Sequence, residues 1–257
     1  MREPEYIFLP VHRVERGDRM FLTFKKWTAL YLLTLLTLFG IFAAILWQGS
    51  AVNASGNLPL EQESGFVLII DPGHGGIDGG AVSADGTVES QINLAVGLRM
   101  EEVAQLLGVE TVMTRRENVD LHDESAETIR QQKISDLKNR AALVNSVSGG
   151  VLVSLHQNSM PQSPSVHGAQ VFYGGAEGSQ ALAETVQTAL NIAVNDRAKE
   201  TKAAGSSVYL LEHAEVPAIL VECGFLSNSD ETALLNTQTH QTRLALTVLS
   251  SVLSHLR

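Results

Sequence analysis

The stretch Val67-Leu-Ile-Ile-Asp-Pro-Gly-His-Gly-Gly76 decides how the rest of the sequence is interpreted. Its first four residues are apolar and mostly β-branched, and the turn-forming Asp71-Pro-Gly73 follows directly, which predicts a short buried strand. His74 comes just after this strand. Because ligands of open α/β sheets bind outside the carboxyl ends of the strands, this histidine is a candidate functional residue. A glycine-rich turn with an incidental histidine remains the alternative at this point.

Strand and helix patterns alternate along the chain after this stretch. The polar, acidic segment 118–132 remains open as a loop or a short helix. Alternation of this kind predicts one α/β domain with a twisted, mainly parallel sheet and helices on both faces. Further strands are predicted at 110–114, 151–155, 169–173, 207–211 and 218–221, and helices at 92–107, 134–144, 179–193 and 240–256.

The N-terminal part of the chain has a different character. Residues 27–47 form an uncharged, largely apolar run with a tryptophan at each edge and two lysines before it, long enough to cross a bilayer as one helix. We expect residues 1–26 to be cytoplasmic, 27–48 to be a single transmembrane anchor, 49–64 a linker, and 65–257 an extracytoplasmic catalytic domain. A cleaved signal peptide is the alternative, but its apolar region would be shorter and its leader less long.

Charge and cysteine content exclude several classes of function. Outside the first 26 residues the chain carries 12 basic and 24 acidic residues, which argues against binding to nucleic acid. Cys223 is the only cysteine, so the chain has no intrachain disulfide and no cysteine-based zinc finger.

The glycine-rich turn does not match the sequence motif of dinucleotide-binding domains. Asp78 stands where that motif requires its last glycine or alanine.

Three chemically competent residues each follow a predicted strand. These are His74, His156 and Glu222, and parallel pairing of their strands would bring them to one edge of the sheet. Glu89 is a fourth candidate, reached through a glycine-containing loop. Two histidines and a carboxylate with an open position for water are typical of catalytic zinc sites, and a second carboxylate could be a general base. Non-catalytic interpretations stay open. Glu89 could be an acidic residue in the first turn of a helix, and His156 could be a half-buried structural histidine. The domain could be a membrane-anchored binding module without catalytic activity. A nucleophilic role for Cys223 is disfavoured, because no obvious base lies near it in sequence.

Four motifs, in this order, resemble those of the zinc-dependent N-acetylmuramoyl-L-alanine amidases of bacterial cell walls. They are Ile70-Asp-Pro-Gly-His-Gly-Gly76, the Glu89 that follows Asp85-Gly-Thr-Val88, Ser154-Leu-His-Gln-Asn158, and Pro217-Ala-Ile-Leu-Val-Glu-Cys-Gly-Phe-Leu-Ser-Asn228. The resemblance extends from Gly65 to the C-terminus. Ser159, where the family commonly has alanine, and Cys223 are small departures from its pattern.

The resemblance implies a zinc ion held by His74, Glu89 and His156, with Glu222 as the catalytic carboxylate. It implies hydrolysis of the amide between the lactyl group of N-acetylmuramic acid and the L-alanine of the stem peptide in peptidoglycan. Asn158, two residues past a ligand, is expected to hydrogen-bond the substrate or the developing oxyanion. Within the family, the chain looks most like the germination-specific spore-cortex branch, which makes muramic δ-lactam jointly with a peptidoglycan deacetylase. A vegetative autolysin of the same chemistry is the alternative.

Overall fold

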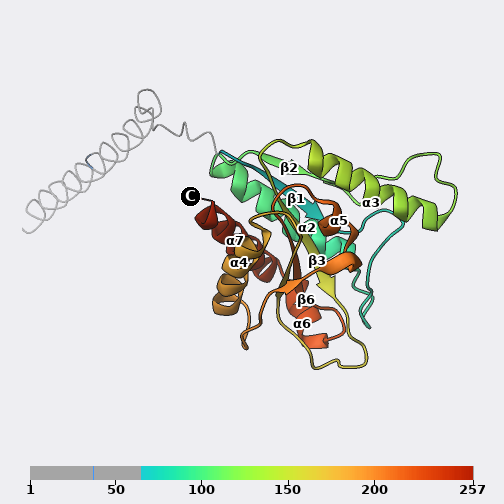
Figure 1. The fold of residues 1–257 in the computed structure, drawn as a ribbon. Helices are drawn as coiled ribbons and strands as arrows, with labels where there is room; N and C mark the ends of the chain where they lie inside the picture. The colour runs from blue at the N-terminus through green and yellow to red at the C-terminus, as the bar shows by residue number, and fades with distance from the viewer. Residues whose placement is uncertain (1–36, 38–64, 257) are drawn as a thin grey trace, which may run out of the picture. The chain divides into compact units, whose positions relative to one another are not determined.

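The computed structural model describes Thr37 and residues 65–256, with the chain from Gly65 onward forming an α/β fold (Figure 1). The segments expected to be cytoplasmic, transmembrane and linker therefore lie, apart from Thr37, outside the described residues. Among the residues that the structure describes, no helix is both long and apolar enough to cross a membrane.

A six-stranded sheet forms the centre of the fold, in the order β2-β1-β3-β6-β4-β5. The pairs β2–β1, β1–β3 and β3–β6 are parallel, whereas β4 runs antiparallel to β6. The predicted mainly parallel sheet is confirmed, with β4 as the strand at which the direction reverses. The strands are β1 (Val67–Pro72), β2 (Thr111–Met113), β3 (Gly150–Asn158), β4 (Gln170–Tyr173), β5 (Lys202–Ala203) and β6 (Ala218–Phe225).

Helices cover both faces of the sheet, as the sequence pattern predicts. On one face, β1, β3 and β6 pack against α2 (Glu89–Leu106), α4 (Ser179–Ala193) and α7 (Gln238–His255), and Figure 1 shows α4 and α7 side by side. On the other face, the alternate side chains of the same strands, such as Ile69 and Leu220, pack against α3 (Ile129–Ser146) and α5 (Tyr209–His213). Each central strand is therefore apolar on both sides, which explains why its sequence reads as an unbroken hydrophobic run.

The predicted strand at 207–211 is wrong. Residues Gly205–Ser207 form the 3₁₀ helix η1, and α5 follows at Tyr209–His213. Leu210 and Leu211 are adjacent and both buried against the second face of the sheet. A short apolar run of this kind cannot be assigned to strand or buried helix by periodicity alone, and tertiary packing decides between them.

Two further segments complete the fold. The open segment 118–132 is a loop as far as Thr128, whose side chain forms a capping box with Gln131 and thereby begins α3. A short helix that the sequence analysis did not predict, α6 (Ser229–Leu235), begins at Asn228, whose side chain accepts a hydrogen bond from the Glu231 amide.

Candidate metal centre and active site

The sheet register brings the predicted site residues together. β3 continues through His156 to Asn158, and His156 and Glu222 are direct cross-strand neighbours on β3 and β6. His74 follows the neighbouring strand β1, and Glu89 is the first residue of α2. Two of the four residues thus lie on strands, one lies in the turn after β1, and one is at the start of α2.

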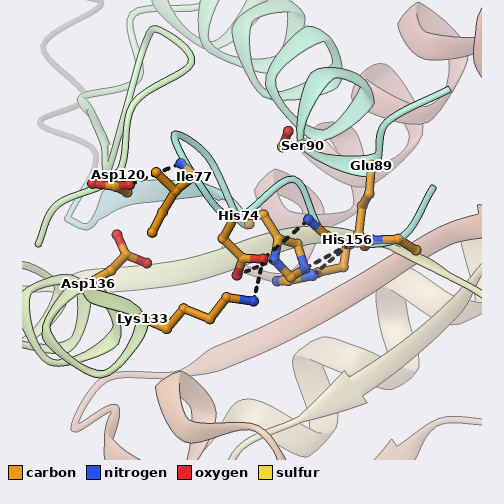
Figure 2. A network of polar contacts seen from close by, with 12 residues as sticks. His74, Ile77, Glu89, Ser90, Asp120, Lys133, Asp136 and His156 are labelled. Atoms are coloured by element: carbon orange, nitrogen blue, oxygen red, sulfur yellow. Dashed lines mark hydrogen bonds and ion pairs between the residues drawn. The ribbon is translucent and has the colours of Figure 1, made fainter. Parts of the chain in front are cut away.

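His74, Glu89 and His156 converge on one point (Figure 2). Oε1 of Glu89 lies 3.2 Å from Nε2 of His74 and 3.0 Å from Nδ1 of His156. One donor atom from each residue lies within 4.8 Å of the other two, so the three side chains can hold one metal ion. Two imidazole nitrogens and one carboxylate oxygen are ligands that zinc accepts in catalytic sites.

Glu89 is buried but well supplied with hydrogen bonds. Its Oε2 accepts from the amide of Ala81 at 2.8 Å, and its Oε1 accepts from the amide of Gln157 at 3.0 Å. Burial alone would raise the pKa of Glu89, but the hydrogen bonds to His156 and His74 outweigh it and the pKa lies well below its usual range. This carboxylate is therefore anionic at neutral pH, as a metal ligand must be.

His74 is oriented by a second carboxylate. Its Nδ1 lies 2.9 Å from Oδ2 of Asp78, which leaves Nε2 directed to Glu89 and His156. Burial lowers the pKa of His74, whereas the hydrogen bonds to Asp78 and Glu89 raise it by more, to about 9. A metal-ligating histidine commonly donates its other ring N–H to a carboxylate in this way, which fixes both tautomer and ring orientation.

Glu222 differs from Glu89 in having no partner for one of its oxygens. Its Oε2 is buried and makes no hydrogen bond. Burial raises the pKa of Glu222 to about 7, and the neighbouring Glu89 contributes to the rise. A carboxyl group that gains and loses a proton near neutral pH is suited to general acid–base catalysis.

The turn that carries His74 is held by two buried arginines. Arg140 donates to the carbonyl of His74 at 2.8 Å and to Oδ1 of Asp71 at 2.6 Å, and its Nε donates to Asp136 at 2.9 Å. Arg115 donates to the carbonyls of Pro72 and Gly73 at 2.8 and 3.1 Å, and to that of Ser90 at 2.8 Å. His74 has a φ of +62°, the only positive value at a non-glycine residue in the described part of the chain. The guanidinium contact to its carbonyl helps to hold this strained conformation.

Close packing around the metal centre requires glycine at two positions. A Cβ atom at Gly73 would overlap the imidazole ring of His156. One at Gly80, whose φ is +72°, would lie 2.7 Å from Cδ2 of His74 and would also meet the Glu89 carboxylate. The glycines of the first motif and its loop thus allow the three candidate ligands to approach one another.

A cavity of about 310 Å³ opens beside these groups. His74, His156 and Glu222 line it, together with Lys133 of α3 and Tyr209 of α5. Asn158 lies outside this lining, at the end of β3, where its side chain accepts a hydrogen bond from the Ser159 amide at 2.8 Å. Cys223 is fully buried, and burial raises its pKa to about 12, which makes it an unreactive core residue.

Sequence analysis missed the residues that position the site. Asp78 was noted only as a mismatch to another motif, and Lys133, Arg115 and Arg140 were not singled out for a role. Arg115 and Arg140 are buried and paired, which their own sequence positions do not indicate. The contacts of Arg115 to Pro72, Lys133 to Asp78 and Arg140 to Asp71 join positions 43, 55 and 69 residues apart, so no local pattern identifies them. The pairs His74–Asp78 and Asp136–Arg140 are only four residues apart.

Comparison with known proteins agrees with this geometry. The sequence profile of the N-acetylmuramoyl-L-alanine amidase family matches residues 68–254. A germination-specific N-acetylmuramoyl-L-alanine amidase of Bacillus subtilis is 33% identical over 201 residues, which cover 77% of this chain and 82% of the relative. The N-acetylmuramoyl-L-alanine amidase LytC of the same organism is 27% identical over 198 residues, 75% of this chain and 36% of LytC.

Solved structures show the same fold. The CwlD amidase of Clostridioides difficile, determined in complex with the GerS lipoprotein, is 34% identical with a TM-score of 0.70, and the match covers 74% of this chain and 98% of that one. The catalytic domain of the amidase CwlV from Bacillus (Paenibacillus) polymyxa is 27% identical with a TM-score of 0.64, covering 74% and 98%. The chain described here therefore belongs to the N-acetylmuramoyl-L-alanine amidase family.

Proposed function

We propose that the amidase uses one zinc ion, held by His74, Glu89 and His156, and that Glu222 is its general base and acid. The observation that carries this proposal is the convergence of two histidines and an anionic carboxylate within 4.8 Å, next to a carboxyl group with an unsatisfied buried oxygen. The donor set fits zinc in number and type, and one position is left for water or substrate.

The chain's own side chains supply the proton transfers. When bound, zinc supplies Lewis acidity toward the scissile carbonyl and toward water. Glu222 is placed beside His156 with a pKa of about 7, so it can take a proton from the attacking water and deliver it to the departing L-alanine nitrogen. Asp78 keeps Nε2 of His74 directed at the metal position. Asn158 is proposed to contact the substrate after rotating away from the Ser159 amide.

Within bacterial physiology, we place the enzyme in spore-cortex formation. The support is the 33% identity to a germination-specific amidase over most of both chains. Its product would be passed to a peptidoglycan deacetylase, so that the two activities together form muramic δ-lactam. The alternative is that the enzyme is an autolysin of the vegetative cell wall with the same chemistry.

The location that we propose is the outer side of the cytoplasmic membrane, with the chain anchored by residues 27–48. The support is the uncharged apolar run at 27–47 with two lysines directly before it in the sequence. Mass analysis of the protein purified from its host should detect the intact N-terminus. A mature N-terminus at about Ser55 would instead indicate signal-peptide cleavage.

The roles of the two glutamates are separated by two substitutions, Glu222→Gln and Glu89→Ala. Glu222→Gln should leave about one zinc per chain and lower turnover by roughly 10²–10⁴-fold, the usual effect of losing general acid–base catalysis. Glu89→Ala should lower zinc content together with turnover, because it removes the anionic ligand. Zinc is measured by plasma mass spectrometry, and turnover by the release of stem peptides that begin with L-alanine.

The opposite pattern would reverse the two roles: zinc lost in Glu222→Gln and kept in Glu89→Ala. Digestion products cut between sugars or within the stem peptide would overturn the reaction itself. Deletion of the gene tests the physiological role, since the cortex should then lack muramic lactam. A normal lactam level with altered vegetative lysis would favour the autolysin.

A further inference from the structure

A chain of polar contacts links the metal centre to helix α3. Nδ1 of His74 lies 2.9 Å from Oδ2 of Asp78, and the other oxygen of Asp78 accepts a hydrogen bond from Nζ of Lys133, also at 2.9 Å. Figure 2 shows Lys133 reaching from α3 toward the His74 side of the site. The contact joins two residues 55 positions apart, so it ties the glycine-containing loop after β1 to helix α3.

Lys133 differs from the other charged residues that line the catalytic cavity. Arg140 is almost fully buried, and it is paired with Asp71 and Asp136, which also line the cavity. The side chain of Lys133 is about half exposed, at 49%, and its one ion pair among the described residues is with Asp78. Two roles are open to such a cation: it can orient the metal ligand through Asp78, or it can bind a carboxylate of the stem peptide directly.

Resting on the zinc site proposed above, we propose that Lys133 is a positioning residue that acts through Asp78 to hold His74 in its zinc-binding orientation. The geometry favours this role over substrate binding, because Lys133 is already within hydrogen-bond distance of the carboxylate that orients His74. Asp78 stands in a loop that must adopt several left-handed glycine conformations, at Gly75, Gly76 and Gly80. The backbone of Asp78 is held by a bridge of two hydrogen bonds to Gly75. Its carboxylate reaches beyond the loop, and the ion pair to Lys133 ties that carboxylate to a helix.

The physical consequence is a zinc affinity that depends on a residue outside the ligand set. Removal of a partner that orients a metal ligand typically lowers affinity or activity by about 10- to 100-fold. Asp78 contacts the candidate ligand His74 directly, and Lys133 has its ion pair with Asp78. We therefore expect Lys133→Met to weaken zinc binding by about 10-fold and Asp78→Ala to weaken it by up to about 100-fold.

The test measures zinc dissociation constants of the full chain, purified in detergent, by competition with a chromophoric chelator. Lys133→Arg keeps a cation at this position and should restore most of the affinity lost in Lys133→Met. Lys138→Met is the matched control: Lys138 is exposed on the same helix, and no ion pair involves it within the described residues. It should bind zinc as the unmodified chain does. Thermal unfolding of all variants in excess chelator checks that the zinc-free fold is unchanged.

A double-mutant cycle tests whether Lys133 acts through Asp78. If it does, Lys133→Met should change zinc affinity by less than about twofold when Asp78 is already alanine, although it has a large effect in the unmodified chain. Asp78→Asn, which retains an acceptor but loses the charge, serves as a second background if Asp78→Ala unfolds. Equal effects of Lys133→Met in both backgrounds would overturn the proposal.

Steady-state kinetics at saturating zinc separate the alternative role. If Lys133→Met raises KM for wall fragments and leaves the zinc dissociation constant unchanged, Lys133 binds substrate and the positioning role is wrong. If the unmodified chain itself binds no zinc, the proposed metal centre is wrong. If the unmodified chain binds zinc and Lys133→Met binds it equally well, only the positioning role of Lys133 is wrong. Weakened zinc binding, rescue by arginine and no effect of Lys138→Met together support the positioning role.

Discussion

The proposed active site, made of the three candidate metal ligands and Glu222, has two halves that are built in different ways. His156 and Glu222 lie on adjacent strands, and the backbone register of β3 and β6 sets their separation. His74 follows β1 and Glu89 begins α2, so neither residue lies on a strand of the six-stranded sheet. We refer to these pairs as the strand half and the loop half.

The loop half depends on side chains from elsewhere in the fold. Buried guanidinium groups hold the turn at His74, and backbone amides of Ala81 and Gln157 hold the Glu89 carboxylate. The strand half needs no such set, because a central parallel strand is already held on both edges. Substitutions far from the ligands should therefore affect the loop half most, and the following predictions test that difference in order of expected effect.

Arg140→Met should have the largest effect on stability. It leaves Asp71 without its cationic partner in a buried position, and the loss of one partner from a buried ion pair typically costs about 3–5 kcal/mol. It also removes the hydrogen bond to the His74 carbonyl. Urea unfolding measures the effect, with Arg130→Met, at an exposed position of the same helix, as the control. Equal stability of the two variants would contradict the role given to the buried guanidinium.

Ser154→Ala should have an intermediate effect that depends on pH. The Ser154 hydroxyl donates to Oδ2 of Asp71 at 2.6 Å, and a hydrogen bond to a charged group contributes about 1.5–3 kcal/mol. Burial raises the pKa of Asp71, but Arg140, Ser154 and Thr114 outweigh it and the pKa falls below 3.8. The ionised Asp71 carboxylate therefore contributes its full stabilisation above pH 3.8, the pKa of the unfolded state. This contribution is lost as the pH falls through the lower pKa of Asp71 in the folded state.

The stability difference between the unmodified chain and Ser154→Ala should shrink as the pH is lowered from 6 to 2. Urea unfolding at several pH values measures it. Ser146→Ala, at an exposed position near the end of α3, is the control and should change stability by less than about 0.5 kcal/mol. A difference that stays constant with pH would mean that the hydroxyl does not act on the charged form of Asp71.

Gly80→Ala should have the smallest effect on stability but a clear effect on the loop half. Its φ of +72° costs a non-glycine residue about 1–2 kcal/mol. Its new methyl group would also press on Glu89 and His74, so zinc affinity should fall. Gly175→Ala is the control, because a Cβ atom there meets nothing within 4 Å. Unchanged zinc affinity in Gly80→Ala would show that the loop can shift without disturbing the ligands.

The difference between the strand half and the loop half also explains which parts of the site could be predicted from the sequence. The strand half was accessible because 151–155 and 218–221 are apolar runs that end at His156 and Glu222, and parallel strands bring their carboxyl ends together. Glu89 entered through the glycine-containing loop and the family resemblance. The roles of Arg140 and Lys133 were not accessible, because their contacts depend on how α3 docks onto the sheet. That of Arg115 depends on the pairing of β2 with β1. The segment 207–211 was assigned wrongly for a related reason, since the sheet face on which it packs decides its conformation.

The Arg140 guanidinium also has a consequence for how the protein folds. It joins α3 to Asp71 and His74 across 69 and 66 residues of sequence. Contacts between segments so far apart must overcome a large loop-closure entropy, so they form late, after local helices and turns. We therefore expect Arg140→Met mainly to speed unfolding, with a φ-value near zero. On this pathway the proposed zinc ion would bind a domain that has already folded, unlike the metal of a zinc finger, which drives folding.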